Sequence, residues 1–347
     1  MFGLASVLAH ALASVRTMLT AALTSSLLAG ALGVLTPPAQ AVETSLDDQV
    51  DAVLVISVDG LNPRAIRLLG PQRAPSLFRL KREGAYTLQA RTELESTSTL
   101  PNHTGMMTGR RVNAAKGGHS ITINEDDGST VQDHAGEQVR SVFNRVHRLA
   151  GSTALFAGKD KFNLLARSWP KAIDRYTRID SNPKLVDAAI ADLNGTRRAL
   201  TFVHLSLPDQ VGHASGFMSP AYLDAVAQTD VQIGRLLNAV HADPWRRAHL
   251  AVIVTADHGG KGPSHYDPTR YADYRIPFFA WGAGIKPTGL YAINPDLANP
   301  GRGRPGYTGP QPVRNGMVAN LVTDLLDIKP VPGSQLDRPR VLQVFAP

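Results

Sequence analysis

The chain has 347 residues, of which 43% are hydrophobic and 19% charged, a composition typical of a folded protein with one large domain or two average ones. Its formal net charge of +7 is scattered in short clusters such as Arg246-Arg247, which favours a generally basic surface over a nucleic-acid patch. The absence of cysteine excludes disulfides and thiolate metal sites, so imidazole and carboxylate groups must hold any metal.

Residues 17–36 are apolar and uncharged, with Arg16 before them and two prolines and the triplet Ala39-Gln40-Ala41 after them. This is the pattern of a secretory signal peptide covering 1–41, and it predicts export to the periplasm or the medium. About 20 apolar residues could also span a bilayer as an uncleaved anchor. The small-x-small triplet favours cleavage, which leaves no stable membrane span. The segment before Arg16 is unusually long for the start of a signal peptide, so the true start codon could lie further along the sequence.

Residues 42–347 alternate strand-like and helix-like segments without an internal repeat or a convincing linker. Strands are predicted at 51–59, 85–92, 153–156, 200–207, 250–256 and 276–281. Helices are predicted at 74–84, 102–109, 137–150, 183–194, 219–242 and 315–327. The stretches 110–136 and 284–312 are rich in Gly, Pro, Asn and Asp and are predicted to be loops. The alternation predicts one domain, a three-layer α/β/α sandwich around a mostly parallel sheet.

The predicted helix 219–242 has the longest apolar stripe in the chain. Asp230 falls on the apolar side of this helix. Its neighbours show no metal-ligand pattern, so we expect Asp230 to be a hydrogen-bonded structural or supporting acid.

Six side chains that can bind metal follow the ends of three hydrophobic runs: Asp59 after 52–58, Asp209 and His213 after 200–207, and Asp257, His258 and His265 after 250–256. Parallel sheets place ligand sites at the carboxyl ends of their strands. Oxygen and nitrogen ligands delivered to one sheet edge therefore predict bound metal ions. An Asp-Gly pair such as Asp59-Gly60 usually marks only a turn, so the prediction depends on the coincidence of the three signals.

The segment 96–103, Ser-Thr-Ser-Thr-Leu-Pro-Asn-His, offers hydroxyl groups just before a predicted helix. Pro101 suits the first turn of a helix, and Thr99 would lie near the positive end of the helix dipole, where an anion is favoured. Ser96, Thr97 and Ser98 are competing hydroxyls, but Thr99 directly precedes the helix entry. Metal ions together with such a hydroxyl point to a hydrolase or a transferase.

These motifs occur in the order used by the alkaline phosphatase superfamily: Asp59-Gly60, Thr99-Leu-Pro-Asn102-His103, Pro208-Asp209 with Gly212-His213, and Thr255-Ala-Asp257-His258-Gly259. Over residues 50–330 the chain resembles the type I phosphodiesterase/nucleotide pyrophosphatase branch of that superfamily. The resemblance implies two Zn²⁺ ions, although similar His/Asp shells also accept Mn²⁺. One ion would be held by Asp59, Asp257, His258 and Thr99, and the other by Asp209, His213 and His265.

The same resemblance implies that Thr99 attacks phosphorus, forming a phosphothreonyl or nucleotidyl-threonine intermediate that is then hydrolysed at the metals. Asn102 would donate its amide to a non-bridging phosphate oxygen, although on sequence alone it could equally cap the helix. His103 and His119 are expected to orient loops or support the ligands. The remaining histidines are interpreted as surface or core residues: His134, His147, His204, His241 and His249.

Cleavage of a phosphodiester or pyrophosphate is the favoured reaction, with a phosphomonoester or a phosphonate as the alternative. Lys159 and Lys161 could neutralise a dianionic phosphoryl group, but an exposed loop is the preferred interpretation of both. Aromatic side chains that could contact the second substituent of a diester are Phe156, Phe162, Trp169 and Tyr176. The expected partner is a small-molecule phosphate ester, without specific nucleic-acid binding, and the oligomeric state is left open.

Three other functions fit the sequence less well. A sulfatase would need a Cys or Ser before a Pro and Arg, and no such pattern follows Asp59. Cofactor-independent phosphoglycerate mutases are longer and use serine. An exported binding protein without activity would have lost a metal ligand or the nucleophile, yet every expected position is filled.

Overall fold

The computed structural model describes residues 50–346, so the predicted signal peptide at 1–41 lies outside the described residues. The described residues form an eight-stranded sheet in the order β4-β3-β5-β1-β6-β7-β2-β8. The strands are β1 (Ala52–Val58), β2 (Ala85–Arg91), β3 (Thr153–Ala157), β4 (Arg175–Arg178), β5 (Leu200–Leu205), β6 (Leu250–Thr255), β7 (Arg275–Gly282) and β8 (Thr288–Gly289). Strand β7 is antiparallel to both of its neighbours, and the other pairs are parallel.

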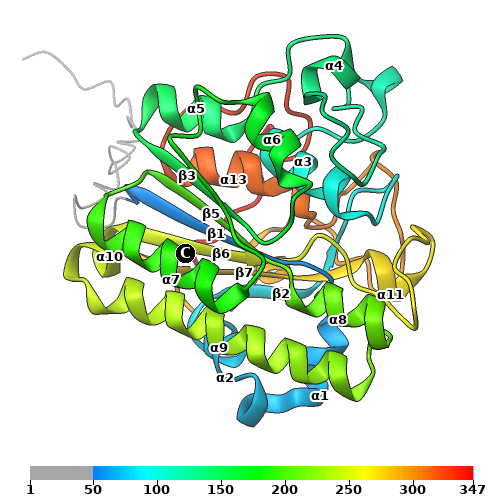
Figure 1. Cartoon of the computed structure of the whole chain (residues 1–347), viewed down its shortest axis with the longest axis vertical. Helices are drawn as coiled ribbons and strands as arrows, with labels where there is room; N and C mark the ends of the chain where they lie inside the picture. Colours follow the sequence, from blue (N-terminus) through cyan, green and yellow to red (C-terminus); the bar gives the residue numbers. More distant parts are fainter. Residues whose placement is uncertain (1–49, 347) are drawn as a thin grey trace, which may run out of the picture. The chain divides into compact units, whose positions relative to one another are not determined.

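The helices lie on both sides of this sheet (Figure 1). One face is covered by α1 (Pro63–Arg73), α2 (Pro75–Glu83), α7 (Asn182–Gly195), α9 (Pro220–Ala242) and α10 (Pro244–His249). The other is covered by α3 (Thr99–Thr108), α5 (Val142–Leu149), α6 (Phe162–Ser168) and α13 (Val318–Leu325). The remaining helical segments are α4 (Val131–Ala135), α8 (Leu207–Ser215), α11 (Tyr271–Tyr274), α12 (Leu290–Ile293), η2 (Ala114–Lys116) and η3 (Asn315–Met317). The predicted α/β/α sandwich with a mostly parallel sheet is confirmed.

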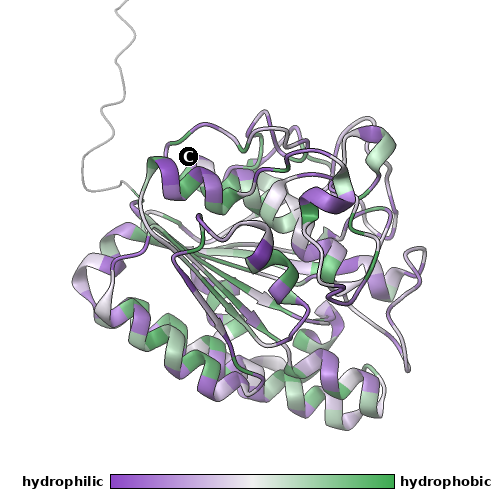
Figure 2. Cartoon of the chain, turned by 45° about the horizontal axis from the view of Figure 1, so that its top comes forward, coloured by the Kyte–Doolittle hydropathy of each residue, from purple (hydrophilic) through white to green (hydrophobic). Residues whose placement is uncertain are grey.

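The three central strands are hydrophobic on both faces because helices cover both sides of the sheet. Every residue of β1, β5 and β6 is buried, and the strands are green in the hydropathy view, with the helices turning their hydrophobic residues toward them (Figure 2). Strand β1 lies between β5 and β6, with Ser57 paired with both His204 and Thr255. The carboxyl ends of these strands are therefore level, which brings the segments that follow them together.

Two predicted helices begin elsewhere. The segment predicted at 137–150 becomes helical only at Val142, because Ser141 and Asn144 form a reciprocal capping box that starts the helix there. The segment predicted at 102–109 begins at Thr99, because the amide of Asn102 already donates to the carbonyl of Ser98, 3.2 Å away. Thr99 is thus the first residue of α3 rather than a residue before it.

Asp230 has the structural role expected of it. Its two carboxylate oxygens accept hydrogen bonds from the backbone amides of Ser76 and Leu77, at 2.9 and 2.7 Å. These amides belong to the first turn of α2, where helical amides have no partner within the helix. Asp230 therefore fixes α2 against α9.

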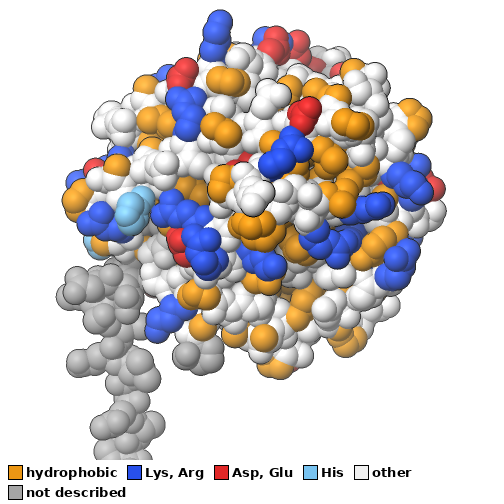
Figure 3. All heavy atoms as spheres, turned by 90° about the horizontal axis from the view of Figure 1, so that it is seen from below, with side chains coloured by type: hydrophobic (Ala, Val, Ile, Leu, Met, Phe, Trp, Pro, Cys, Tyr) orange, Lys and Arg blue, Asp and Glu red, His pale blue; other side chains and the backbone are white. Residues whose placement is uncertain are grey.

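Among residues 50–346, no helix combines the length and apolar character needed to cross a membrane. The surface that carries α1, α2 and α9 shows many more Lys and Arg side chains than Asp and Glu (Figure 3). This agrees with the net charge of +7.

Candidate active site

Three aspartates meet at the carboxyl edge of the sheet. Asp59 follows β1, Asp257 follows β6, and Asp209 lies in the first turn of α8, after β5. All three are at most 2% exposed. Gly60 makes this approach possible because it has a φ of 71° and because a Cβ at this position would lie 3.1 Å from the Cα of Asp209. The Asp-Gly pair is thus both a turn and a point of close packing.

Each carboxylate has one oxygen that is held by protein donors. Oδ1 of Asp257 accepts from the backbone amides of Gly60 and His258, at 3.0 and 2.9 Å. Oδ2 of Asp59 accepts from Nε2 of His204 at 2.9 Å and lies 2.6 Å from Nζ of Lys159. The ammonium group of Lys159 also lies 2.5 Å from Oδ2 of Asp209.

The other oxygen of each carboxylate has no hydrogen-bond partner among the described residues, although all three atoms are buried. These atoms are Oδ1 of Asp59, Oδ1 of Asp209 and Oδ2 of Asp257. A buried carboxylate oxygen without a donor is costly. The three atoms face the imidazole Nε2 atoms of the nearby histidines, so they point toward one shared space.

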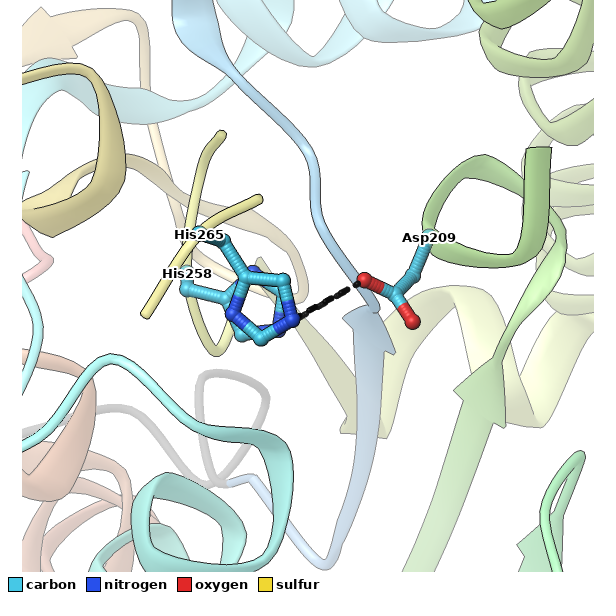
Figure 4. A group of neighbouring side chains, drawn as sticks. All are labelled: Asp209, His258 and His265. Atoms are coloured by element: carbon cyan, nitrogen blue, oxygen red, sulfur yellow. Dashed lines mark ion pairs between the residues drawn. The ribbon is translucent and has the colours of Figure 1, made fainter. Parts of the chain in front are cut away.

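Two of these histidines are held in the tautomer that a metal ligand needs. Nδ1 of His258 lies 2.9 Å from the carbonyl of Gly259, and Nδ1 of His265 lies 2.7 Å from the carbonyl of Thr97. A carbonyl can only accept, so each Nδ1 donates and each neutral ring keeps a lone pair on Nε2. The two rings stack at 3.5 Å and both present Nε2 toward Asp209 (Figure 4).

The first cluster, called here the Asp257 group, is formed by Asp59, Asp257 and His258. Nε2 of His258 lies 3.2 Å from Oδ2 of Asp257 and 3.3 Å from Oδ1 of Asp59. The hydroxyl of Thr99 lies 3.4 Å from the same nitrogen. Four side chains from three separate segments thus converge within the reach of one ion.

The second cluster, called here the Asp209 group, is formed by Asp209, His213 and His265. Nε2 of His213 lies 3.0 Å from Nε2 of His265 and 3.5 Å from Oδ1 of Asp209, which is 3.6 Å from Nε2 of His265. His258 adjoins this group as well, with its Nε2 3.8 Å from Oδ1 of Asp209. The side chain of His213 is 36% exposed, which puts the Asp209 group on the solvent side.

The charges in this cluster are strongly perturbed. Burial raises the pKa of Asp257, and the nearby Asp59 raises it further, to about 8. Burial also acts to raise the pKa of Asp59, but Lys159, His204 and His258 outweigh it and hold that pKa well below its usual value. Burial opposes a charge on His258, yet Asp257, together with the other acids, raises its pKa to about 9. Three buried carboxyl groups are thus crowded beside Lys159, and without a bound cation protons on Asp257 and His258 reduce their mutual repulsion.

This donor set fits divalent cations. Three carboxylate oxygens without donors, three imidazole nitrogens and one hydroxyl suit Zn²⁺ or Mn²⁺ better than Mg²⁺, which prefers oxygen ligands throughout and retains water. A cation would also provide the buried oxygens with the partner that the protein does not supply. All seven predicted metal-site residues lie within this one cluster.

Of the four hydroxyls at 96–99, that of Thr99 lies beside the cluster, 3.4 Å from Nε2 of His258. The hydroxyl of Thr97 instead donates to the carbonyl of His265 at 2.5 Å, and that of Ser96 accepts from the amide of Ser98 at 3.1 Å. Thr99 is 1% exposed and is the first residue of α3. Its hydroxyl therefore lies where the positive end of the helix dipole favours negative charge.

Asn102 is engaged differently from the phosphate contact expected of it. Its two amide N–H groups donate to the carbonyls of Ser96 and Ser98, both at 2.9 Å, and its oxygen accepts from the amides of Glu93 and Asn315, at 2.9 and 3.0 Å. Both N–H groups and the oxygen of the Asn102 side-chain amide are therefore already hydrogen-bonded. In this arrangement Asn102 positions the segment that carries Thr99, and no N–H is free for a phosphate oxygen.

Lys159 differs from its sequence interpretation, and His204, a core residue as interpreted, also takes part in the site. Lys159 was expected in an exposed loop but is 14% exposed and joins Asp59 to Asp209. It follows the end of β3 just as the aspartates follow their strands, which is the signal that could have identified it. His204, expected only to be a core or surface residue, is a buried polar residue in β5 that also accepts from the amide of Gly158 at 3.2 Å and donates to Asp59.

Two supporting residues were not singled out by the sequence. Asn124 accepts the free helical amide of Leu100 at 3.0 Å, beside Thr99. Asn315 donates to the carbonyl of Asp257 at 3.1 Å. Asn124 lies in a predicted loop and Asn315 at the start of a predicted helix, and neither position gave a pattern from which a role could be predicted. His103 supports the site as expected, donating from Nδ1 to the carbonyl of Thr99 at 2.8 Å.

The aromatic side chains proposed for a substrate pocket belong mostly to the core. Phe156 and Phe162 are fully buried and Trp169 is 2% exposed, so they cannot contact a substituent at the surface. Only Tyr176 is partly buried, and its hydroxyl bonds to Asn163. The exposed aromatic at the site is instead Tyr266, which is 54% exposed and lies 5.8 Å from the ring of His213.

Residues 130–296 match the family described as type I phosphodiesterase/nucleotide pyrophosphatase. This range contains the Asp209 group, Asp257 and His258, and leaves out Asp59 and Thr99. A curated relative, the 2,3-bisphosphoglycerate-independent phosphoglycerate mutase of Rhodopseudomonas palustris, is 37% identical over 79 residues. Those residues are 23% of this chain, and the chain spans only 14% of that relative's length.

Solved structures share the fold at low identity. Murine ectonucleotide pyrophosphatase/phosphodiesterase 5, in an inactive form in complex with AMP, has a TM-score of 0.58 and 15% identity, covering 81% of this chain and 96% of that one. A lipoteichoic acid synthase from Listeria monocytogenes has a TM-score of 0.59 and 14% identity, covering 86% and 76%. The family match and the fold agree. Over residues 130–296 the chain is thus similar to the type I phosphodiesterase/nucleotide pyrophosphatase family, and its described residues share the fold of these solved structures.

Proposed function

We propose that this protein cleaves phosphodiesters or pyrophosphates through a covalent intermediate on Thr99, at a centre that binds two divalent cations, most suitably Zn²⁺. The observation that carries the proposal is the convergence of three carboxylate oxygens without donors and three imidazole Nε2 atoms, with the buried hydroxyl of Thr99 beside His258. We assign Asp59, Asp257, His258 and Thr99 to one ion. We assign Asp209, His213 and His265 to the other.

The chemistry that the ions would supply is activation of the hydroxyl and stabilisation of the charge on the reacting oxygens. The protein supplies the geometry. Asn102 and His103 hold the backbone on both sides of Thr99, so its Oγ1 is presented from a fixed helical turn. In the first step Oγ1 forms a bond to phosphorus, the bond between phosphorus and the ester oxygen breaks, and the proton of Oγ1 leaves with that oxygen and its substituent. Water then displaces Oγ1 from phosphorus, which restores Thr99 and completes the hydrolysis.

Diester or pyrophosphate cleavage is supported by the family match and by Tyr266, which exposes an aromatic ring beside His213 and His265. A second candidate, cleavage of a monoester or a phosphonate, is favoured by Lys159. If cations neutralised Asp59 and Asp209, the ammonium group could turn toward a third phosphoryl oxygen. Lys159 and Lys161 both already have acidic partners, since Lys159 pairs with Asp59 and Asp209, and Lys161 lies 3.1 Å from Glu125. We therefore rank the diester first.

The test compares turnover of bis-p-nitrophenyl phosphate, p-nitrophenyl phosphate, an aryl phosphonate ester and a dinucleotide. Each is assayed before and after chelation and after Zn²⁺ or Mn²⁺ is restored, with metal content measured by elemental analysis. We expect the diester and the dinucleotide to react fastest, and chelation to remove all activity reversibly. A strong preference for the monoester would reverse the ranking, and full activity in the chelated protein would refute the metal centre.

We also propose that the protein is exported, on the basis of the apolar segment 17–36 and the Ala39-Gln40-Ala41 triplet. Cell fractionation and N-terminal sequencing test this. Export predicts a mature N-terminus at Val42 in the periplasm or the medium. A chain that keeps residues 17–36 in the membrane fraction would instead identify an anchor.

A further inference from the structure

A second pocket of about 450 Å³ lies next to the catalytic centre and is lined mainly by cations. Its wall is built from three parts of the chain, namely the start of α1, the segment 261–275, and the loop that carries Arg302. Six of the nine lining residues are basic: Arg64, Arg67, Lys261, Arg270, Arg275 and Arg302. No lining residue is acidic, so this concave surface is strongly positive.

Most of these charges are not neutralised by the protein. Within residues 50–346, Arg270 is paired with Asp273, whereas the other five basic residues of the pocket form no ion pair. Arginines elsewhere on the same face do have partners, as Arg73 has Asp224 and Arg79 has Glu83. Like charges held together without a counter-ion raise the free energy of the site, and a bound anion would lower it.

Arg275 gives the pocket a built cation rather than a mobile surface charge. It is 6% exposed, and its Nε donates to the carbonyl of Leu88 at 2.7 Å. The two terminal nitrogens of its guanidinium have no hydrogen-bond partner in the described part of the chain. Burial lowers the pKa of Arg275, and Arg67 and Arg302 lower it further. These two nitrogens are not among the buried polar atoms that lack a partner, so they are open to the pocket and can donate to an anion bound there.

The ring of Tyr271 organises two of these guanidinium groups. The central carbon of Arg275 lies 5.3 Å from the ring centroid, and that of Arg302 lies 4.7 Å from it. The ring therefore serves to hold cations, and it is not a free surface on which a base could stack. Guanidinium groups fixed in this way match the bidentate geometry of phosphate oxygens.

We propose that this pocket binds a small ligand with two or more linked phosphate groups, at a site separate from the catalytic centre. Five cations without ion-pair partners are more than a single phosphate can contact, and their position around one pocket of about 450 Å³ fits a compact ligand better than an extended polymer. None of the nine lining residues is among the proposed metal ligands.

The pocket is nevertheless connected to the loops of the catalytic centre. The backbone amides of Gly259 and Gly260, which follow His258, both donate at 2.8 Å to carbonyls of Asp273 and Ala272 in α11. Arg270 also donates to the carbonyl of Ser264, the residue before His265. This layer of backbone separates the two sites, so binding in the pocket can be measured independently of turnover.

The test is isothermal titration calorimetry of the full chain with inorganic pyrophosphate as the probe. The variant R67Q/R302Q removes two exposed charges of the pocket, and R82Q/R247Q removes two exposed charges from elsewhere as the matched control. We expect R67Q/R302Q to bind pyrophosphate at least tenfold more weakly than the wild type, and the control to stay within twofold. Both variants retain the same catalytic centre, so any binding there is common to them.

Two further arms make the result specific. Orthophosphate should bind at least tenfold more weakly than pyrophosphate. The variant R275K keeps the positive charge but loses the two parallel N–H donors of the guanidinium group, and it should weaken pyrophosphate binding several-fold. Equal pyrophosphate affinity in the wild type and both double variants would overturn the proposal. So would orthophosphate binding as tightly as pyrophosphate, or a single-stranded oligonucleotide binding at the pocket in place of pyrophosphate. The readout is binding, so failure here would leave the proposed catalytic function untouched.

Discussion

The ammonium nitrogen of Lys159 lies 2.6 Å from Oδ2 of Asp59, in the interior of the catalytic centre. The same nitrogen also contacts Asp209, and the two aspartates raise the pKa of the lysine although burial acts to lower it. Lys159 thus ties together one carboxylate from each proposed metal group. It joins the two groups through their Oδ2 atoms, whereas the Oδ1 atoms of Asp59 and Asp209 face His258 and His265.

Replacing Lys159 with Met should destabilise the metal-free protein because it leaves two buried carboxylates without their cation. Removing one partner of a buried ion pair typically costs about 3–5 kcal/mol. The change should be smaller with Zn²⁺ present, since the ions also neutralise the carboxylates. Thermal unfolding with and without chelator measures it. Lys161→Met is the control, because Lys161 pairs with the 84% exposed Glu125, and equal melting temperatures for both variants would contradict the role of Lys159.

Replacing Thr99 with Ala should abolish nearly all turnover, by about 10³-fold or more, because it removes the only hydroxyl beside His258 that the structure offers to phosphorus. Zinc content should be preserved, since the other six ligands remain. Thr99→Ser should retain measurable activity. Steady-state rates with elemental analysis check this, and substantial activity in Thr99→Ala would exclude the covalent mechanism.

Replacing Tyr266 with Ala should lower kcat/KM for aryl diesters by about tenfold, because the exposed ring is the aromatic surface next to the Asp209 group. The melting temperature should not change, since the side chain is 54% exposed. Rates on p-nitrophenyl phosphate serve as the internal control. An equal loss on monoester and diester would show that Tyr266 does not select the second substituent.

Asn102→Ala should reduce both stability and kcat. The substitution leaves the carbonyl of Ser96 and the amide of Glu93 without this partner and removes one of the two donors to the carbonyl of Ser98, at a cost of about 1–3 kcal/mol for each buried group left unpaired. If Asn102 acts by positioning, Asn315→Ala, which removes a donor to Asn102, should lower kcat in the same direction. A large kcat loss in Asn102→Ala with no effect of Asn315→Ala would instead indicate a direct phosphate contact.

Glu93 should make stability depend on pH. Burial raises the pKa of this carboxyl from 4.5 to about 7, against the lowering effects of Tyr307, Arg314 and Arg111. The folded chain therefore holds a proton between these values that the unfolded chain releases, so the free energy of unfolding falls as pH rises from about 5 to 7. Glu93→Gln removes this dependence. Its free energy of unfolding relative to that of the wild type should therefore rise by up to about 3 kcal/mol between pH 5 and pH 8. Denaturation at pH 5 and pH 8 measures this, and parallel pH curves would contradict it.

The hydrophobic runs of β1, β5 and β6 were sufficient to predict a parallel sheet, because strands covered on both faces must be apolar throughout. The aspartates that follow these strands could be placed at one edge because the carboxyl ends of parallel strands meet there. The motifs around Thr99 and His258 indicated the superfamily. These signals are local, since each depends on residues close together in the chain. The start of α5 was misplaced because a capping box at Ser141 outweighed the apolar pattern before it.

Only the tertiary structure decided which side chains complete the site. Lys159 is a charged residue in a segment that resembles an exposed loop. It is nevertheless buried, because Asp59 and Asp209, from distant parts of the chain, form ion pairs with it. Asn102 occupies a motif position, but its partners at Ser96, Glu93 and Asn315 show that it supports the backbone. Periodicity and spacing report which face a residue occupies. They do not report which distant charges share that face, because the pairing energy depends on contacts that exist only after the sheet has formed.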